Sequence, residues 1–238
     1  DASLDALCAA VQQPDARVRN AVVLALGGFF DPKAQKSLME AVRSEKNPGI
    51  VATALRALGP YQNPEVREVL SDSLLRASYR NRILEGAVAA IRVQDDPRFA
   101  SALTGIIQKR LSEFSGTLAT SVLETVGFIS RYEQNRDTVR EALLAQVASP
   151  RETVRVAAIG GLGMLEDARS VGVLETFASA SPSKPEKAAA DRALEKIRSS
   201  RKGNEELKAL REEVVELKKT GSELKKDLEG VRKKLESK

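Results

Sequence analysis

Apolar residues recur along this chain in a pattern that favours α-helices arranged as a tandem repeat. Six segments each carry an apolar residue that is usually followed by glycine, at spacings of 32, 33, 35, 36 and 35 residues. The six apolar residues are Leu26, Leu58, Ile91, Val126, Leu162 and Ile197. Apolar residues also stand three, four and eight positions before each of them. These offsets share one face of a 3.6-residue helix, so each segment is predicted to be an amphipathic helix.

A second set of helical segments lies between these six, so each repeat is predicted to be a helical hairpin. The additional helices are expected over residues 4–12, 33–44, 65–77, 98–111, 137–148 and 168–178. Asp31, Asn47, Asn63 and Asp96 each stand directly before a proline at or near the expected start of a helix. Asx side chains cap helix N-termini well, and proline fits the first helical turn. The pattern therefore predicts twelve helices in six hairpins.

The repeat also predicts how the hairpins assemble. One hairpin is too small to bury its own apolar stripe, whereas hairpins stacked in a row bury it between neighbours. We therefore expect an all-α fold with two domains: an α-solenoid of six hairpins over residues 1–200, and a C-terminal coiled-coil helix over residues 201–238.

Two segments resemble the short HEAT-like repeat of the phycobilisome-lyase type. They are Pro14–Gly27 and Pro150–Gly163, which share a Val-Arg pair followed by alanine and an apolar-Gly ending. The other repeats keep the apolar columns but lose the arginine. The resemblance extends over residues 3–199 and implies a HEAT-like fold, but such solenoids serve many functions.

Short HEAT-like hairpins followed by a lysine- and glutamate-rich heptad tail are also similar to the C-terminal region of bacterial aminopeptidase N-like zinc metallopeptidases. In that family an HExxH helix in an upstream domain binds the catalytic zinc, and none of those residues can be placed on this chain. The resemblance implies a region that caps or gates an active site located elsewhere. Because the sequence begins at Asp1, we also expect it to be a piece of a longer protein. The alternative is a standalone scaffold protein that forms a dimer through its C-terminal tail.

The tail carries a heptad seam over residues 205–235. Its apolar positions are Leu207, Leu210, Val214, Leu217, Leu224, Leu228, Val231 and Leu235, with Gly221 among them. The e positions are basic and the g positions are mostly acidic, so a parallel pair brings opposite charges together, as in Glu213 with Lys218. The pattern favours a parallel homodimer. Docking of the tail on its own solenoid or on a neighbouring part of a longer protein is the alternative.

Composition mainly excludes catalytic chemistry. The chain has no histidine and one cysteine, Cys8, which excludes histidine-dependent catalysis, an HExxH zinc site and an internal disulfide. No paired set of carboxylates or lysines at helical spacing suggests a reaction. We therefore expect this chain to be no enzyme and to have no catalytic residues, metal or cofactor, with an enzyme built on the solenoid as a remote alternative.

Charge and aromatic content bear on the partner. The net charge of +5 divides into +3 for residues 201–238 and +2 for residues 1–200, and tryptophan is absent. A nucleic-acid binder concentrates basic charge on one face, so nucleic-acid binding, as in HEAT-like DNA glycosylases, is a remote alternative. The longest apolar stretches have about ten residues, where a membrane span needs roughly 20. The leading expectation is a non-catalytic module that binds a protein or peptide on its concave face, and both cytoplasmic and exported locations fit.

The densest basic patch in the solenoid predicts a binding surface. It comprises Arg56, Tyr79, Arg80, Arg82 and Arg92, and a phosphate or an acidic peptide could dock there. The alternative is a solvated turn at the start of a helix.

Other residues are expected to be structural. Arg19 and Arg155 lie on the buried side of second helices and are expected to bridge to neighbouring repeats, with Asp15 and Glu152 as candidate partners. Cys8 and the six phenylalanines are expected in the core. Small residues such as Gly86 and Ala157 on the predicted concave face suit closely packed helices or a groove for a partner's backbone.

Overall fold

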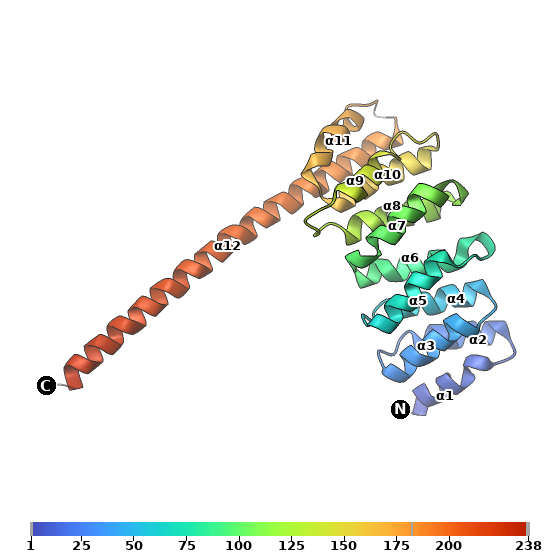
Figure 1. Ribbon diagram of the computed structural model, residues 1–238, viewed down its shortest axis with the longest axis horizontal. Coiled ribbons are helices and arrows are strands. Elements are labelled where there is room, and N and C mark those ends of the chain that lie inside the picture. Colours follow the sequence, from blue (N-terminus) through green and yellow to red (C-terminus); the bar gives the residue numbers. More distant parts are fainter. Residues whose placement is uncertain (1, 182, 237–238) are drawn as a thin grey trace. The chain divides into compact units, whose positions relative to one another are not determined.

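The computed structural model describes residues 2–181 and 183–236, apart from the side chains of residues 204–205, 207–209, 223–224 and 226–236. Within this part of the chain, twelve α-helices form and no strand does (Figure 1). The chain divides into two compact units, Asp1–Leu194 and Glu195–Lys238. The predicted all-α fold of stacked helical hairpins is therefore confirmed.

Each hairpin in the first unit has a first and a second helix. The first helices are α1 (Ala2–Ala9), α3 (Pro32–Ser44), α5 (Pro64–Leu75), α7 (Ala100–Arg110), α9 (Asp137–Leu144) and α11 (Val171–Ala178). The second helices are α2 (Ala16–Leu26), α4 (Pro48–Leu58), α6 (Arg82–Gln94), α8 (Gly116–Ile129), α10 (Glu152–Leu165) and the start of α12 (Pro185–Glu236). The division between the two units falls inside α12, and the helix continues past Ser200, where the sequence predicts a domain boundary.

Short 3₁₀ turns adjoin several helices. They are η1 (Ala10–Gln12), η2 (Tyr79–Asn81), η3 (Pro97–Phe99), η4 (Leu111–Glu113) and η5 (Ala168–Ser170). The expected helices over residues 98–111 and 168–178 therefore each begin as a 3₁₀ turn, and the helix expected to reach residue 148 ends at Leu144.

All four predicted Asx–Pro caps form. The side chains of Asp31, Asn47, Asn63 and Asp96 each accept a hydrogen bond from a backbone N–H two or three residues further on, at 2.7 to 3.0 Å. A cap of this kind satisfies a donor that has no partner within the helix. Two adjacent residues, an aspartate or asparagine and the proline after it, therefore fix the start of each of these elements: α3, α4, α5 and η3.

The apolar stripes are buried, as the repeat predicts. Leu26, Leu58, Ile91 and Leu162 are each 0% exposed. Expectations about the core are wrong at Phe30 and met only in part at Cys8, Phe29, Phe128 and Phe177, which are half-buried. Phe30 is 77% exposed and stacks on the ring of Tyr61, with centroids 4.9 Å apart, because it follows the end of α2 and points outside the stripe. Cys8 is partly exposed, because it borders a groove described below.

The second helices pack directly on one another through small residues. A Cβ on Gly86 would lie 2.6 Å from Cα of Ala52, and a Cβ on Gly161 would lie 2.7 Å from the carbonyl oxygen of Leu123. Gly86 and Ala157 are buried by this packing, so both are wrong as solvent-facing positions. Because the second helices approach more closely than the first helices do, they form the inner, concave layer of the stack.

Candidate binding surface

The solvent side of the inner layer is hollowed between α4, α6 and α8. The hollow has a volume of about 390 Å³ and contains both charged and small side chains. It is lined by Arg56, Glu85, Val88, Ala89, Arg92, Ser121, Glu124 and Thr125. Two residues of the predicted basic patch, Arg56 and Arg92, therefore lie together on the concave face.

Glu85 connects this hollow to a third arginine of the patch. Nη2 of Arg56 lies 3.2 Å from Oε1 of Glu85, and Nη1 of Arg82 lies 3.1 Å from Oε2. All three side chains are at least one-third exposed, so each pair stabilises the fold by at most about 1 kcal/mol. The main consequence is positional, because two guanidinium groups hold one carboxylate at the edge of the hollow.

Arg92 is held differently from Arg56. Its Nη1 donates to the carbonyl oxygen of Glu124 at 2.9 Å, and its Nη2 donates to Sδ of Met164 at 3.6 Å. The guanidinium carbon lies 3.8 Å from the centre of the Phe128 ring. Burial lowers the pKa of Arg92, since the surrounding groups do not fully replace the water removed from its charge.

Phe128 lies between two guanidinium groups. The centre of the Arg131 guanidinium is 3.7 Å from the same ring centre, and two such groups do not fit side by side on one face of a phenyl ring. Arg131 also forms a bidentate pair with Asp95 and stacks on Tyr132 at 4.2 Å. The hydrogen bond to Asp95 raises the pKa of Arg131. The sequence predicts only that Phe128 lies in the core. Nothing in the sequence near Arg92 or Phe128 indicates that the two side chains meet, because they stand on different helices, α6 and α8.

Tyr79 and Arg80 lie apart from the Arg56–Arg92 hollow. They belong to η2, where Arg80 and Asn81 both have left-handed backbone angles with φ of 52° and 55°. Tyr79 is 75% exposed. A second hollow of about 450 Å³ is lined by Arg80, Asn81, Arg82, Glu85, Glu113, Ser115, Thr117 and Leu118. The structure therefore divides the four arginines of the predicted patch between two hollows that share Glu85, and Tyr79 lines neither of these two hollows.

The two bridging arginines are structural, as expected, but their partners differ from the candidates. Nε of Arg19 lies 2.6 Å from Glu45, and Nη2 of Arg155 lies 2.7 Å from Glu186. Both guanidinium groups also donate to two backbone carbonyls in the loop just before the second helix of their own hairpin. Asp15 instead caps α2 and pairs with Arg17.

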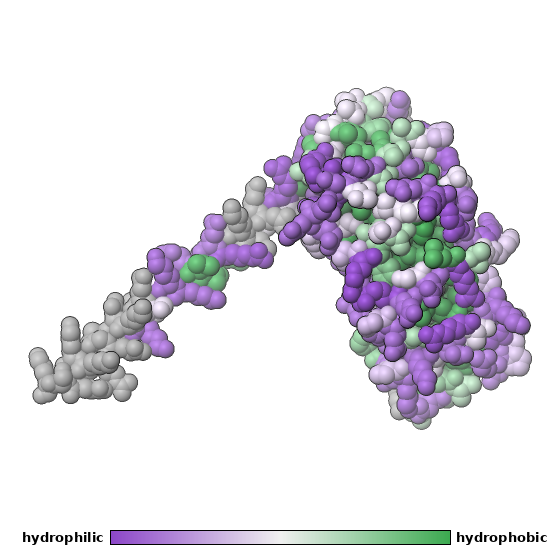
Figure 2. Space-filling view, viewed as in Figure 1, coloured by the Kyte–Doolittle hydropathy of each residue, from purple (hydrophilic) through white to green (hydrophobic). Residues whose placement is uncertain are grey.

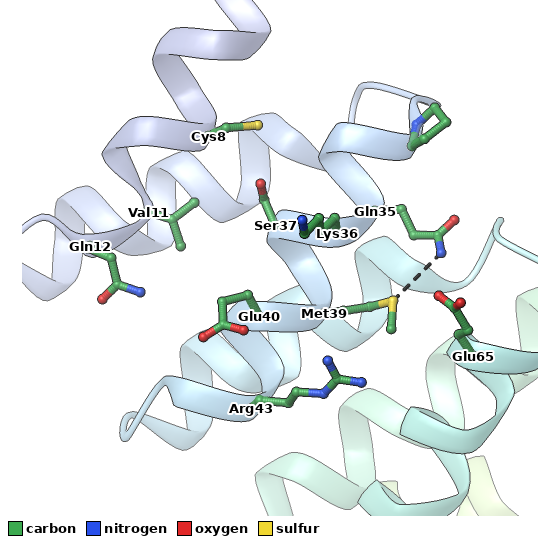
Figure 3. Close-up of a pocket in the computed structure, with 11 residues that line it drawn as sticks. Cys8, Val11, Gln12, Gln35, Lys36, Ser37, Met39, Glu40, Arg43 and Glu65 are labelled. Carbon is green, nitrogen blue, oxygen red and sulfur yellow. Dashed lines mark hydrogen bonds between the residues drawn. The ribbon is translucent and has the colours of Figure 1, made fainter.

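A larger groove lies on the first-helix side of the stack. It encloses about 970 Å³ between α1–η1 and α3, with Glu65 of α5 at one end (Figure 3). Cys8, Val11 and Met39 line its apolar part, and Gln35 donates to Sδ of Met39 at 3.6 Å. Lys36, Glu40, Arg43 and Glu65 place charges of both signs around it.

The predicted seam of the tail is exposed where its side chains are described. Leu210, Val214 and Leu217 are 57%, 43% and 64% exposed, and Val215, outside the seam, is also exposed. Figure 2 shows a hydrophobic patch on the described part of this helix. The side chains of the other seam residues, Leu207, Leu224, Leu228, Val231 and Leu235, lie outside the described residues.

Stacked helical hairpins with a close-packed inner layer define an α-solenoid. Residues 4–92 match the family model of HEAT repeats, which supports the HEAT-like resemblance of the sequence. HEAT repeats commonly mediate protein interactions. No curated protein matches the chain. Among the described residues, none of the helices combines the length and the apolar character that crossing a membrane requires.

Proposed function

We propose that this chain is a non-catalytic module that binds a protein or peptide on its concave layer. The observation that carries the proposal is the hollow between α4, α6 and α8, whose walls are helices already packed backbone to backbone. A preformed surface lowers the ordering cost of association. Arg56, Arg82 and Arg92 are proposed to contact the partner, with Tyr79 and Arg80 at the margin of the contact.

The charges in the hollow favour a protein partner over a nucleic acid. Glu85 and Glu124 line it together with Arg56 and Arg92, and carboxylates repel a phosphate backbone. A nucleic-acid site would present mainly basic side chains. A mobility shift with DNA or RNA that weakens steeply with salt would contradict the proposal.

Site-specific photo-cross-linking tests the binding surface. A photoreactive residue at Ala89, inside the hollow, should cross-link to a discrete protein partner in cells that produce the chain. The matched control is Gln108 on α7, an exposed position on the first-helix side. The proposal is wrong if both positions give the same products, or if only Gln108 reacts.

We further propose that residues 205–235 pair with a second copy as a parallel coiled coil. The exposed Leu210, Val214 and Leu217 support this, as does the charge pattern that sets Glu213 against Lys218 of the partner. Light scattering should give a dimer mass for the full chain and a monomer mass for a chain ending at Ser200. The shorter chain should keep the cooperative melting of the solenoid, which also tests the predicted domain boundary.

The relative orientation of the two paired helices needs a separate measurement. In a parallel, in-register pair, Val214 of one chain faces Val214 of the other chain. The variant Val214→Cys in a Cys8→Ser background should therefore form an intermolecular disulfide. Lys219→Cys, on the solvent side of the same helix, is the control and should cross-link far less. Equal monomer masses, or equal cross-linking at both positions, would rule out the parallel pair.

The narrower expectation, a region of an aminopeptidase N-like zinc peptidase, is supported by the sequence resemblance alone. The reading frame upstream of Asp1 tests it directly. An HExxH motif followed by a downstream glutamate would support it, and a start codon immediately before Asp1 would exclude it.

A further inference from the structure

Arg92, Arg136 and Arg151 are half-buried arginines for which no ion pair forms among the described residues, and of these three Arg92 lines the hollow between α4, α6 and α8. Arg67, Arg131 and Arg140 each have a carboxylate oxygen within 3.1 Å. Arg92 instead donates to one carbonyl oxygen and one thioether sulfur. A guanidinium has five N–H donors in a planar fork, so donors beyond these two contacts remain on a side chain that lines the hollow.

The charges in and beside the hollow do not balance. Glu85 is already bound by Arg56 and Arg82. The Glu124 carboxylate lies against α10, since a Cβ on Gly160 would be 3.0 Å from its Oε1. Arg56 and Arg92 line this hollow with Glu85 and Glu124, and Arg82 shares Glu85 from the second hollow. Three guanidinium groups therefore lie in or beside the hollow with two carboxylates, which leaves one positive charge in excess.

The guanidinium of Arg92 is also held in place before any ligand arrives. Phe128 supports one of its faces, and Arg131, fixed by Asp95, supports the other side of that ring. A side chain that is already ordered loses little conformational entropy on binding. The hollow therefore presents a preorganised fork for a planar anion.

We propose that Arg92 anchors a carboxylate of an acidic segment of the partner, an aspartate or glutamate side chain bound in bidentate fashion. This inference rests on the proposed binding function of the concave layer and names its chemistry. One carboxylate neutralises the single uncompensated charge, whereas a phosphate carries nearly two negative charges and would face Glu85 and Glu124. The class of partner is therefore an acidic peptide or protein segment.

Arginine side-chain NMR on the full chain tests this without a variant. The probes are an acetylated and amidated peptide of alternating glutamate and alanine, its glutamine counterpart, and inorganic phosphate. The Nε–H resonance of Arg92 should shift with the glutamate peptide and stay in place with the glutamine peptide. Phosphate should bind more weakly than the glutamate peptide.

Variants then locate the interaction. Arg92→Gln should weaken binding of the glutamate peptide at least about tenfold, since a charge-assisted bidentate contact is lost. Arg92→Lys keeps the positive charge but loses the planar fork of donors, so its affinity for the glutamate peptide should lie between those of the unchanged chain and of Arg92→Gln. Arg17→Gln, at an exposed position of α2 that lines neither hollow, is the matched control and should change binding less than about twofold. Melting curves of all three variants show whether they remain folded.

The outcomes separate this inference from the proposed function. A shift of the Arg80 or Arg82 resonances without Arg92, equal binding of the glutamine peptide, or tighter binding of phosphate would overturn the carboxylate anchor. If no acidic peptide binds while the Ala89 cross-link still captures a protein, the anchor is wrong and the binding surface stands. If both fail, the proposed function is wrong as well.

Discussion

The inner and outer layers of this solenoid are held together by different kinds of contact. In the inner layer, Gly127 of α8 and Gly161 of α10 bring the two helix backbones into direct contact. In the outer layer, successive first helices are joined by long polar side chains, such as Arg140 on α9 reaching Asp167 before η5. A row with closely spaced second helices and widely spaced first helices must curve, so the difference between the layers produces the concave face.

The outer contacts follow a rule of their own. The residue four positions after the N-cap of one first helix binds the N-cap side chain of the next. The pairs are Gln35 with Asn63 at 2.9 Å, Arg67 with Asp96 at 3.1 Å, and Arg140 with Asp167 at 2.7 Å. Ala100 occupies this position in the fourth repeat and has no polar group to offer, so the rule is interrupted there.

The inner layer should be the more sensitive to a change of size. Gly161→Val adds a side chain whose Cβ would lie 2.7 Å from the carbonyl oxygen of Leu123 and 2.8 Å from Cδ2 of Leu143. Because backbone cannot move aside as a side chain can, we expect a loss of about 3 kcal/mol or more in the free energy of unfolding. Urea denaturation measures it, and a loss below about 1 kcal/mol would contradict the close-packed inner layer.

The outer layer should be the more sensitive to a loss of charge. Asp167 caps η5 and accepts hydrogen bonds from Arg140 and Arg169, and its side chain is only 7% exposed. Asp167→Ala leaves both guanidinium groups without this carboxylate, so we expect a loss of about 2–3 kcal/mol. A midpoint in urea equal to that of the unchanged chain would show that the outer contacts do not stabilise the stack.

The same carboxylate makes the outer layer sensitive to acid. Burial by itself raises the pKa of Asp167, but hydrogen bonds from Arg169 and Arg140 outweigh it and lower the pKa from 3.8 to about 2. A folded-state pKa below the unfolded value stabilises the fold fully above about pH 5 and no longer does so once the pH falls below about 2. This contribution is about 2 kcal/mol. Asp167→Asn should flatten the acid limb of the stability curve, and an unchanged limb would contradict this assignment.

A smaller change in stability should distinguish a partly buried ion pair between repeats from an exposed ion pair within one repeat. Arg155→Met removes a partly buried pair with Glu186 and should cost about 1–3 kcal/mol. Arg17→Met removes an exposed pair with Asp15, in which Arg17 is 92% exposed, and should change stability by less than about 0.5 kcal/mol. Equal melting temperatures for the two variants would show that the bridge between repeats contributes nothing.

The smallest expected change in stability is an increase and not a loss. A Cβ on Gly105 of α7, in the outer layer, would meet no atom within 4 Å. Gly105→Ala should therefore raise stability by about 0.5–1 kcal/mol through helix propensity. Destabilisation by this substitution would mean that the outer layer is packed as tightly as the inner one.

Features set by neighbouring residues could be predicted from the sequence. The Asx–Pro caps at Asp31, Asn47, Asn63 and Asp96 depend on the backbone of the next two or three residues, and all four form. The bridging role of Arg19 could be predicted from its place on the helix. Its partner Glu45 could not, because it stands 26 residues further along and reaches Arg19 only once the repeats stack.

The candidate site was predictable in composition but not in arrangement. The basic residues Arg56, Arg82 and Arg92 could be named from the sequence, yet Glu85 forms ion pairs with two of them and Phe128 supports the third. These contacts join residues on different helices, and their distances depend on how closely those helices approach. A helical wheel gives the direction of each side chain and not the separation of the helices.

The amino-acid sequence by itself determined the helices, their caps and the stacking of hairpins, because periodicity and capping act within a few residues and every repeat exposes the same apolar stripe. Only the tertiary structure decided which arginines are compensated, which glycines are contact points and where the concave hollow lies. Those properties depend on distances between helices, and in this solenoid the distances are set by side-chain volume and charge meeting across repeats.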